Sequence, residues 1–198
     1  RVYGTPDALD PYSGYKAKAY PAWYHDLRSV MKDSLPTDDQ TFPLIYSVTS
    51  EDRFFRVQAP EPLGEVEGPA IDSQLFKVGT GIQWSEAEFQ RAAERIYTVE
   101  RAITVRHFGR TRAMDETTYD SYTYQENWAN PLLEERYGLD REQFAPVTDE
   151  YYDLLGWDQR TGWPLPERLQ ALGIGELHAP MTEGALKASA RVQLEAQS

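Results

Sequence analysis

The stretch WSEAEFQRAAERIYTVERAITVRHFG, Trp84 to Gly109, carries the clearest structural signal in this sequence of 198 residues. Ser85 and Glu88 have the spacing of a capping box, and Trp84 is placed to pack on Phe89 as a hydrophobic staple. Apolar residues then recur at helical spacing, at Phe89, Ala92, Ala93, Ile96, Val99, Ala102 and Ile103. Glycine at 109 favours a left-handed helix end. We therefore predict a core helix that ends near Phe108.

Shorter helical patterns flank this segment. From Ala22 an apolar face consists of Trp23, Leu27, Val30 and Met31, and Pro36 ends it. A second pattern runs up to Gly156 and consists of Val147, Tyr151, Leu154 and Leu155. Residues 166–173 predict a short helix, because proline begins the segment and glycine follows it. The tail, residues 182–198, is rich in helix formers and predicts a terminal helix prone to fray.

The remaining segments predict irregular structure. Residues 1–21 mix glycine, proline and tyrosine without an apolar period, so no regular element is expected there. Residues 42–82 hold short apolar pieces interrupted by PEPLGEVEGPAID, which predicts a surface excursion and low to moderate strand content. The fold class predicted is mostly α, a helical domain with long irregular connections and little strand. Residues 1–181 form that domain, and residues 182–198 form a terminal helix or tail.

Composition restricts the classes of partner and site. The chain has 20 Lys and Arg against 32 Asp and Glu, a net charge of -12, so nucleic acid is an unfavourable partner. It contains no apolar run long enough for a membrane span and no secretory signal, so we expect a soluble, cytoplasmic protein. The absence of cysteine excludes disulfides, thiolate nucleophiles and cysteine-ligated metal sites supplied by this chain alone. The opening Arg1 suggests a piece of a larger protein.

Few residues point to chemistry by their type and spacing. Asp33 and Asp38 flank a proline-containing turn that is able to grip a polar ligand through carboxylate and backbone groups, although a solvated acidic loop has the same pattern. The three histidines show no metal-ligand spacing; they are His25, His107 and His178. Arg106, Arg110 and Arg112 form a basic cluster that is able to bind a phosphate or the acidic surface of a neighbouring domain. Alternatively, the cluster only reflects the preference for cations at a helix C-terminus. The abundant tyrosine and tryptophan side chains are typical either of long loops packed on a helical core or of an interface with another domain or subunit.

Three segments together resemble the C-terminal third of the tungsten-containing aldehyde:ferredoxin oxidoreductase family. They are WYHDLRSVMKDSLPTDDQTFP (residues 23–43), RIYTVERAITVRHFGRTRAMDE (residues 95–116) and EYYDLLGWDQRTGWPLPERLQALGI (residues 150–174). The first is similar to a family helix followed by Asp-Ser-Leu-Gly-Leu-Cys, the second to a helix ending in a Val-Arg-x-x-x-x-Arg turn, and the third to a tyrosine pair, Gly-Trp-Asp and Gly-x-Pro. The segments lie in the family's order.

The resemblance implies a helical third domain that closes a cofactor site with the N-terminal domains of the same protein. That cofactor is a tungsten (or molybdenum) bis-pterin beside an iron-sulfur cluster, working with an electron-transfer iron-sulfur protein or subunit on a small-molecule substrate. Asp33 matches the aspartate that hydrogen-bonds a pterin, and the Thr37 backbone matches the loop group that meets it. Asp38 occupies the place of the cysteine that ligates the cluster. No residue of this chain is assigned a catalytic role.

The loop departs from the family pattern at Pro36, Thr37 and Asp38, which stand where glycine, leucine and cysteine occur. An aspartate oxygen is able to ligate iron, but it is a harder ligand than thiolate; alternatively, Asp38 contacts only the pterin. The implied activity is oxidation of aldehydes to carboxylates, with electrons leaving through iron-sulfur centres. A second implied activity is reduction of an aromatic acyl-coenzyme A (benzoyl-coenzyme A), because this loop resembles that tungsten subunit more closely. A non-catalytic acidic helical interaction module is a third possibility.

Overall fold

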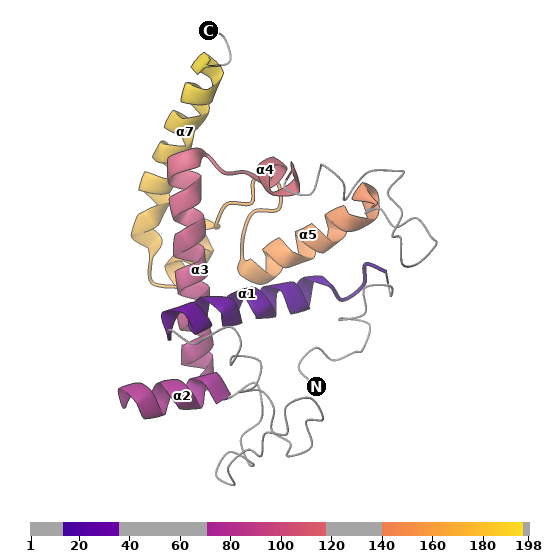
Figure 1. The fold of residues 1–198 in the computed structure, drawn as a ribbon. Helices are drawn as coiled ribbons and strands as arrows, with labels where there is room; N and C mark the ends of the chain where they lie inside the picture. The colour runs from indigo at the N-terminus through magenta and orange to yellow at the C-terminus, as the bar shows by residue number, and fades with distance from the viewer. Residues whose placement is uncertain (1–13, 36–70, 118–139, 196–198) are drawn as a thin grey trace. The chain divides into compact units, whose positions relative to one another are not determined.

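The computed structural model describes residues 14–35, 71–117 and 140–195, which are drawn as ribbon in Figure 1. Its elements are α1 (Ala19–Ser34), α2 (Ile71–Thr80), α3 (Glu86–Phe108), α4 (Arg112–Thr117), α5 (Arg141–Leu155), α6 (Pro166–Ala171), the 3-10 turn η5 (Gly175–Leu177) and α7 (His178–Glu195). The extended pairing in these ranges is a single bridge between Trp157 and Pro164. The predicted mostly α fold class is confirmed.

The chain divides into two compact units. The larger unit comprises residues 3–24 and 97–198, and the smaller unit comprises residues 25–96. The division falls within α1 and within α3, so each of these helices contributes residues to both units.

The start of α3 has the predicted capping box. The Ser85 backbone N–H donates to the Glu88 carboxylate at 2.8 Å, and the Glu88 N–H donates to the Ser85 hydroxyl at 3.3 Å. The aromatic contact at this end differs from the predicted staple, because Trp84 stacks on Phe76 at 4.8 Å between ring centroids and Phe76 also meets Phe89 at 5.6 Å. Local hydrogen bonds therefore fix the helix start, while a residue of α2 joins the two rings.

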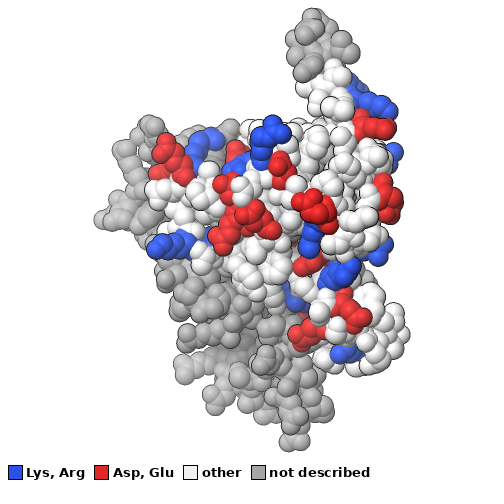
Figure 2. Space-filling view, turned by 180° about the vertical axis from the view of Figure 1, so that it is seen from behind, with Lys and Arg blue, Asp and Glu red and all other residues white. Residues whose placement is uncertain are grey.

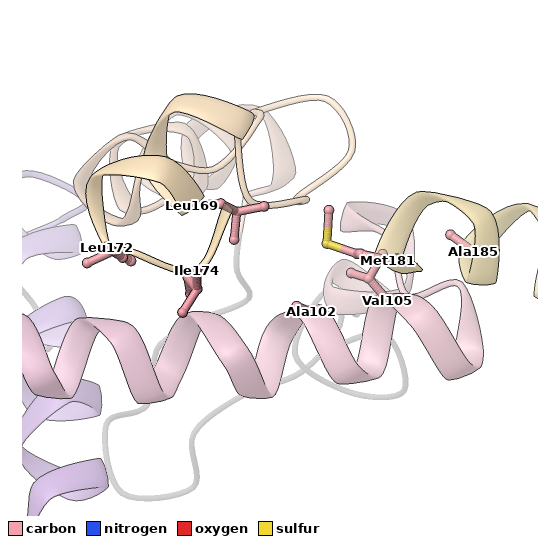
Figure 3. Close-up of a cluster of buried hydrophobic side chains, with 7 residues drawn as sticks. All are labelled: Ala102, Val105, Leu169, Leu172, Ile174, Met181 and Ala185. Atoms are coloured by element: carbon pink, nitrogen blue, oxygen red, sulfur yellow. The ribbon is translucent and has the colours of Figure 1, made fainter. Parts of the chain in front are cut away.

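The main core of the larger unit lies where α7 runs along the second half of α3 (Figures 1 and 3). Its buried members are Ala102, Val105, Leu169, Leu172, Ile174, Met181 and Ala185. Gly184 permits this contact, because a Cβ atom there would stand 2.4 Å from the Arg106 carbonyl oxygen. The prediction that Ile103 belongs to the buried stripe was wrong, since it is 50% exposed. The buried face of α3 instead passes through Thr98, which is fully covered.

A second apolar cluster in the larger unit surrounds Trp157. It contains Tyr152, Leu155 and Trp157, with Trp23, Tyr97 and Tyr151 packed against it. Tyr152 is buried, whereas the sequence pattern assigned the inward position to its neighbour Tyr151. The phenol oxygens of Tyr97 and Tyr151 share a hydrogen bond at 2.7 Å, so the Tyr151 ring is held at the side of the cluster.

The ends of α5 and α6 carry the expected local signals. Asp140 caps α5 by accepting from the backbone N–H groups of Glu142 and Gln143, and Gly156 closes it with φ 70°. Pro166 begins α6, and Gly173 follows it with φ 70°. Three helix starts differ from prediction: α1 begins at Ala19, α5 begins before the predicted apolar pattern, and α7 begins at His178 instead of residue 182. The predicted boundary after residue 181 thus falls inside a continuous helix and stays untested as a domain limit.

The smaller unit contains the end of α1, α2 and the first half of α3. Leu27, Val30 and Met31 are buried, which confirms the predicted inward face of α1. The helix α2 was not predicted; residues 71–80 were assigned to irregular structure with some strand, and that prediction was wrong. Its buried positions include Asp72 and Ser73, so the apolar period that reveals a helix in sequence is missing on this face. Most of the predicted surface excursion lies outside the described residues.

Candidate functional site

The end of α1 carries the first residue predicted to bind a cofactor. Asp33 is the penultimate residue of the helix, and its side chain is 71% exposed. Lys32 lies beside it, with Nζ 3.2 Å from the Asp33 carboxylate. The Leu35 N–H donates to the carbonyl oxygens of Met31 and Lys32, and this closes the last turn. The helix therefore ends as predicted, and Asp33 lies in its last turn.

This position suits the binding of an external donor. An ionised carboxylate accepts several hydrogen bonds, and Lys32 meets one oxygen of Asp33. Carbonyl dipoles at a helix C-terminus disfavour a negative charge, so the helix itself does not account for this aspartate. The other two predicted residues, Thr37 and Asp38, lie outside the described residues. The cofactor roles of all three stay predictions.

A second site lies in the larger unit around the buried guanidinium of Arg101. Its Nη1 and Nη2 atoms donate to the two carboxylate oxygens of Asp115, at 3.0 and 2.7 Å. Its Nε atom donates to the Gly162 carbonyl oxygen at 2.8 Å, and its Cζ lies 4.9 Å from the Trp157 ring centroid. A two-pronged ion pair of this kind fixes both partners in orientation as well as position. We call Arg101, Asp115 and Tyr152 the Asp115 cluster.

The Asp115 carboxylate accepts hydrogen bonds from two further side chains. The Arg110 Nε atom donates to its Oδ1 at 2.6 Å, and the Tyr152 hydroxyl donates to its Oδ2 at 2.6 Å. Burial raises the pKa of Asp115, but the hydrogen bonds from Arg101, Tyr152 and Arg110 outweigh it, so the pKa is lowered. Burial and then the hydrogen bond to Asp115 raise the pKa of Tyr152. Both shifts favour the observed arrangement, in which an ionised Asp115 accepts a hydrogen bond from the neutral Tyr152 phenol.

A neighbouring ion-pair group fastens the turn that follows α5. Arg112 donates to Glu116 at 2.7 Å, to the carboxylate of Asp149 and to the carbonyl oxygen of Gln159 at 2.8 Å. Two members of the predicted basic cluster, Arg110 and Arg112, are thus paired with acidic groups of their own chain. Arg106 is exposed at the end of α3. On the face shown in Figure 2, acidic and basic side chains of the described residues are interspersed.

The histidines occupy exposed positions. His25 lies on α1, His107 near the end of α3 and His178 at the start of α7. Within the ranges that the structure describes, no group of three His, Asp or Glu side chains is arranged to hold a metal ion. In those ranges, too, none of the helices is long and apolar enough to cross a membrane.

The Asp115 cluster joins two of the segments that carry the family resemblance. Arg101 and Asp115 come from the segment at residues 95–116, whereas Tyr152 and Gly162 come from the segment at residues 150–174. Comparison with known families gives a match over residues 2–174 to aldehyde ferredoxin oxidoreductase, domains 2 and 3. The chain belongs to the aldehyde ferredoxin oxidoreductase family. No solved structure matches the chain.

Membership in the aldehyde ferredoxin oxidoreductase family places the chain among oxidoreductases, and it matches the family model that describes domains 2 and 3. The match includes every element from α1 to α6, whereas α7 lies beyond it. The match supports the predicted assignment to a C-terminal part of the family. It does not separate the aldehyde-oxidising enzymes from the benzoyl-coenzyme A reductase branch.

Sequence reasoning missed the members of the Asp115 cluster as interacting residues. A usable signal was present, because Arg101 lies on the inward face of α3 between Thr98 and Val105. An arginine at such a position requires an anionic partner, since an unpaired buried charge is strongly unfavourable. Which aspartate supplies that partner depends on the turn after Phe108, and the sequence alone leaves several acidic residues as candidates.

Proposed function

We propose that this chain forms part of a tungsten (or molybdenum) bis-pterin oxidoreductase that oxidises aldehydes to carboxylates. Family membership over residues 2–174 is the observation that carries this proposal. The remainder of the enzyme comprises the N-terminal domains of the same protein. Electrons leave through iron-sulfur centres to an electron-transfer iron-sulfur protein or subunit, and the substrate is a small molecule.

The chemistry of the α1 end supports a role in holding the pterin. The Asp33 carboxylate is largely exposed and has Lys32 on one side, which leaves acceptor capacity for N–H groups of a heterocycle. Such a hydrogen bond to an ionised acceptor is stronger than one between neutral groups. The Thr37 backbone and Asp38 complete the proposed contacts, with Asp38 as a candidate ligand of the iron-sulfur cluster. The exposed Asp33 carboxylate therefore fits a group that carries N–H donors.

When bound, the bis-pterin metal supplies the two-electron chemistry, and this chain supplies position and insulation. The Asp33 carboxylate would orient the organic ring by accepting hydrogen bonds from its N–H groups. The Asp115 cluster fixes α3, α4, α5 and the turn at Gly162 as a rigid frame in the larger unit.

The test uses the full-length enzyme and the variant Asp33→Ala. We expect a lower content of bound pterin, measured by fluorescence of the oxidised pterin after release, with metal analysis in parallel. Asp33→Asn retains one carbonyl acceptor and should give an intermediate content. Glu150→Ala removes an exposed carboxylate from α5 and serves as the matched control. Unchanged cofactor content in Asp33→Ala would remove this residue from the site.

The second candidate is the tungsten subunit of an aromatic acyl-coenzyme A reductase. It is favoured by the loop residues Pro36, Thr37 and Asp38, where this chain departs from the pattern of the aldehyde oxidisers. Turnover of an aldehyde against turnover of an aromatic thioester by the complete enzyme separates the two activities. A purified native enzyme without pterin, metal or iron-sulfur absorption would instead indicate the non-catalytic interaction module.

A further inference from the structure

Lys32 and Asp33 are neighbours in the last turn of α1, and their side chains differ strongly in exposure. The Lys32 side chain is 13% exposed, whereas that of Asp33 is 71% exposed. A lysine on a helix surface normally extends its ammonium group into water and stays largely exposed. The Lys32 side chain instead lies mostly covered, and its Nζ atom ends 3.2 Å from Oδ1 of Asp33. The covered member of this ion pair is the cation, and the exposed member is the carboxylate.

Adjacency in the chain does not by itself produce this contact. Successive residues of an α-helix point about 100° apart around its axis, so side chains at i and i+1 do not face each other. The contact between Lys32 and Asp33 therefore requires the two side chains to turn toward each other. Because the Lys32 side chain is mostly covered by protein, it has few alternative positions, and its ammonium group is the fixed point of the pair. Lys32 thus determines where one oxygen of the Asp33 carboxylate lies.

The position of the pair at a helix end adds to this effect. Carbonyl dipoles at a helix C-terminus stabilise a cation and destabilise an anion, so they favour Lys32 and disfavour Asp33. The Ser34 hydroxyl donates to the Val30 carbonyl oxygen at 2.8 Å in the same turn and uses neither charged side chain. The Lys32 ammonium group therefore offsets a negative charge that the helix itself disfavours.

A carboxylate held in this way is prepared for a ligand. An exposed aspartate rotates freely, and a ligand that fixes it must offset the lost side-chain freedom. Lys32 meets Oδ1 of Asp33, and an ionised carboxylate has about four acceptor positions on its two oxygens, so Oδ2 keeps its acceptor capacity. Fixing a binding group in advance raises the affinity for the ligand, because this entropic cost is removed.

We propose that Lys32 is a positioning residue: its ammonium group holds Oδ1 of Asp33 and so presents Oδ2 to the N–H donors of the pterin. This proposal rests on the function proposed above, in which Asp33 accepts hydrogen bonds from that ring. Lys32 acts through Asp33 and does not itself contact the ring, because its covered side chain offers little surface to a ligand. The family resemblance assigned a role to Asp33 but none to Lys32.

Substitution of Lys32 in the full-length enzyme tests this role through retention of the pterin. Lys32→Met keeps an unbranched apolar side chain in the covered position but removes the ammonium group. We expect pterin to be released about two- to fivefold faster than from the wild type. The measurement is the fluorescence of oxidised pterin that stays with the protein after gel filtration at successive times. Lys32→Arg retains the cation and should restore most of the retention. A release rate in Lys32→Met equal to the wild-type rate, or slower, would overturn the proposal.

Lys77→Met is the matched control. Lys77 is the basic residue in the last turn of α2, as Lys32 is in the last turn of α1. Its chain neighbours are the uncharged residues Phe76 and Val78. Lys77→Met therefore removes the same interaction with a helix C-terminus without affecting an adjacent aspartate. We expect this variant to release pterin at the wild-type rate. An increase equal to that in Lys32→Met would overturn the proposal, because loss of a cation at a helix end would then suffice.

A double-mutant cycle separates positioning from a purely structural role. If Lys32 acts through Asp33, Lys32→Met should not change the release rate further in an Asp33→Ala background. A structural role would speed release by the same factor in both backgrounds, and that result would overturn the proposal. Unchanged pterin content in Asp33→Ala would remove the proposed function and this inference together. A loss in Asp33→Ala without faster release in Lys32→Met would remove this inference and leave the function standing.

Discussion

Two buried arginines, one in each unit, have their positive charges neutralised by different arrangements of partners. Arg28 in the smaller unit and Arg101 in the larger unit have side chains that are 11% and 7% exposed. Each pairs with an aspartate and lies over an aromatic ring, Phe89 or Trp157. Arg101 engages both oxygens of Asp115, which accepts from two further side chains, whereas Arg28 divides its two terminal nitrogens between Asp72 and Gln90. The carboxylate of Asp115 is thus shared among three donor side chains, whereas the guanidinium of Arg28 is shared between a carboxylate and an amide oxygen.

The two ion pairs differ in the secondary-structure elements that they connect. The Asp115 cluster ties together four segments, namely α3, α4, α5 and the turn at Gly162. The hydrogen bonds of Arg28 join α1 to α2 and to the first half of α3. A network of satisfied partners specifies one arrangement of several elements, whereas a single buried pair is exchangeable for apolar packing at little loss.

The largest effect is expected for Asp115→Asn. The change leaves the buried Arg101 guanidinium without its counter-charge, and removing one partner of a buried pair costs about 3 to 5 kcal/mol in the free energy of unfolding. Denaturant titration followed by aromatic fluorescence measures this loss. Glu116→Gln, on the same helix α4 and facing Arg112, is the control and should cost about 1 kcal/mol or less. Equal losses in the two variants would contradict the distinction between Asp115 and an ordinary surface acid.

The pair in the smaller unit should behave differently when both partners are replaced. Arg28→Met alone leaves Asp72 buried without its cation and should cost about 3 kcal/mol in the free energy of unfolding. The double variant Arg28→Met, Asp72→Leu should recover most of that loss, because the two apolar side chains fill a similar volume. A double-mutant cycle by denaturant titration measures the recovery. If the double variant is no more stable than the single one, Arg28 is also part of a larger network.

Tyr152→Phe probes the network without removing a charge. The phenol donates to a carboxylate, and loss of such a hydrogen bond should cost about 1.5 to 3 kcal/mol in the free energy of unfolding. The pKa of Asp115 is lowered in the fold, so its contribution to stability is present above its unfolded pKa and is lost as the pH falls through its folded pKa. Removing the Tyr152 donor raises that folded pKa. The acid unfolding limb, followed by circular dichroism, should therefore move to higher pH.

The smallest effect is expected at the start of α3 in the smaller unit. Ser85→Ala removes the hydroxyl that accepts from the Glu88 N–H and should cost about 1 kcal/mol in the free energy of unfolding. Ser85→Asp retains an acceptor and should restore most of the stability. A loss in Ser85→Ala as large as that in Asp115→Asn would show that α3 depends on its cap more than on its buried face.

Much of the helical layout was predictable because its signals are local. The capping box at Ser85, the glycine after α5 and the proline at the first position of α6 each act within one helical turn, and the structure has all three. The helix α2 was not predictable by the same reasoning. Its inward face is polar because Arg28, a residue 44 positions away from Asp72, neutralises it. Ile103 was misassigned because the buried positions of α3 also include Thr98 and Arg101, which an apolar period does not register.

The sequence by itself determined the helical class, the ends of the strongest helices, the absence of thiol chemistry and the resemblance that the family match later supported. It also placed Asp33 at the end of a helix. Only the tertiary structure decided which charges are buried, which aspartate meets Arg101 and which side of α2 faces outward. The physical reason is that caps and periods depend on neighbours along the chain, whereas the environment of a charge depends on residues brought together by folding.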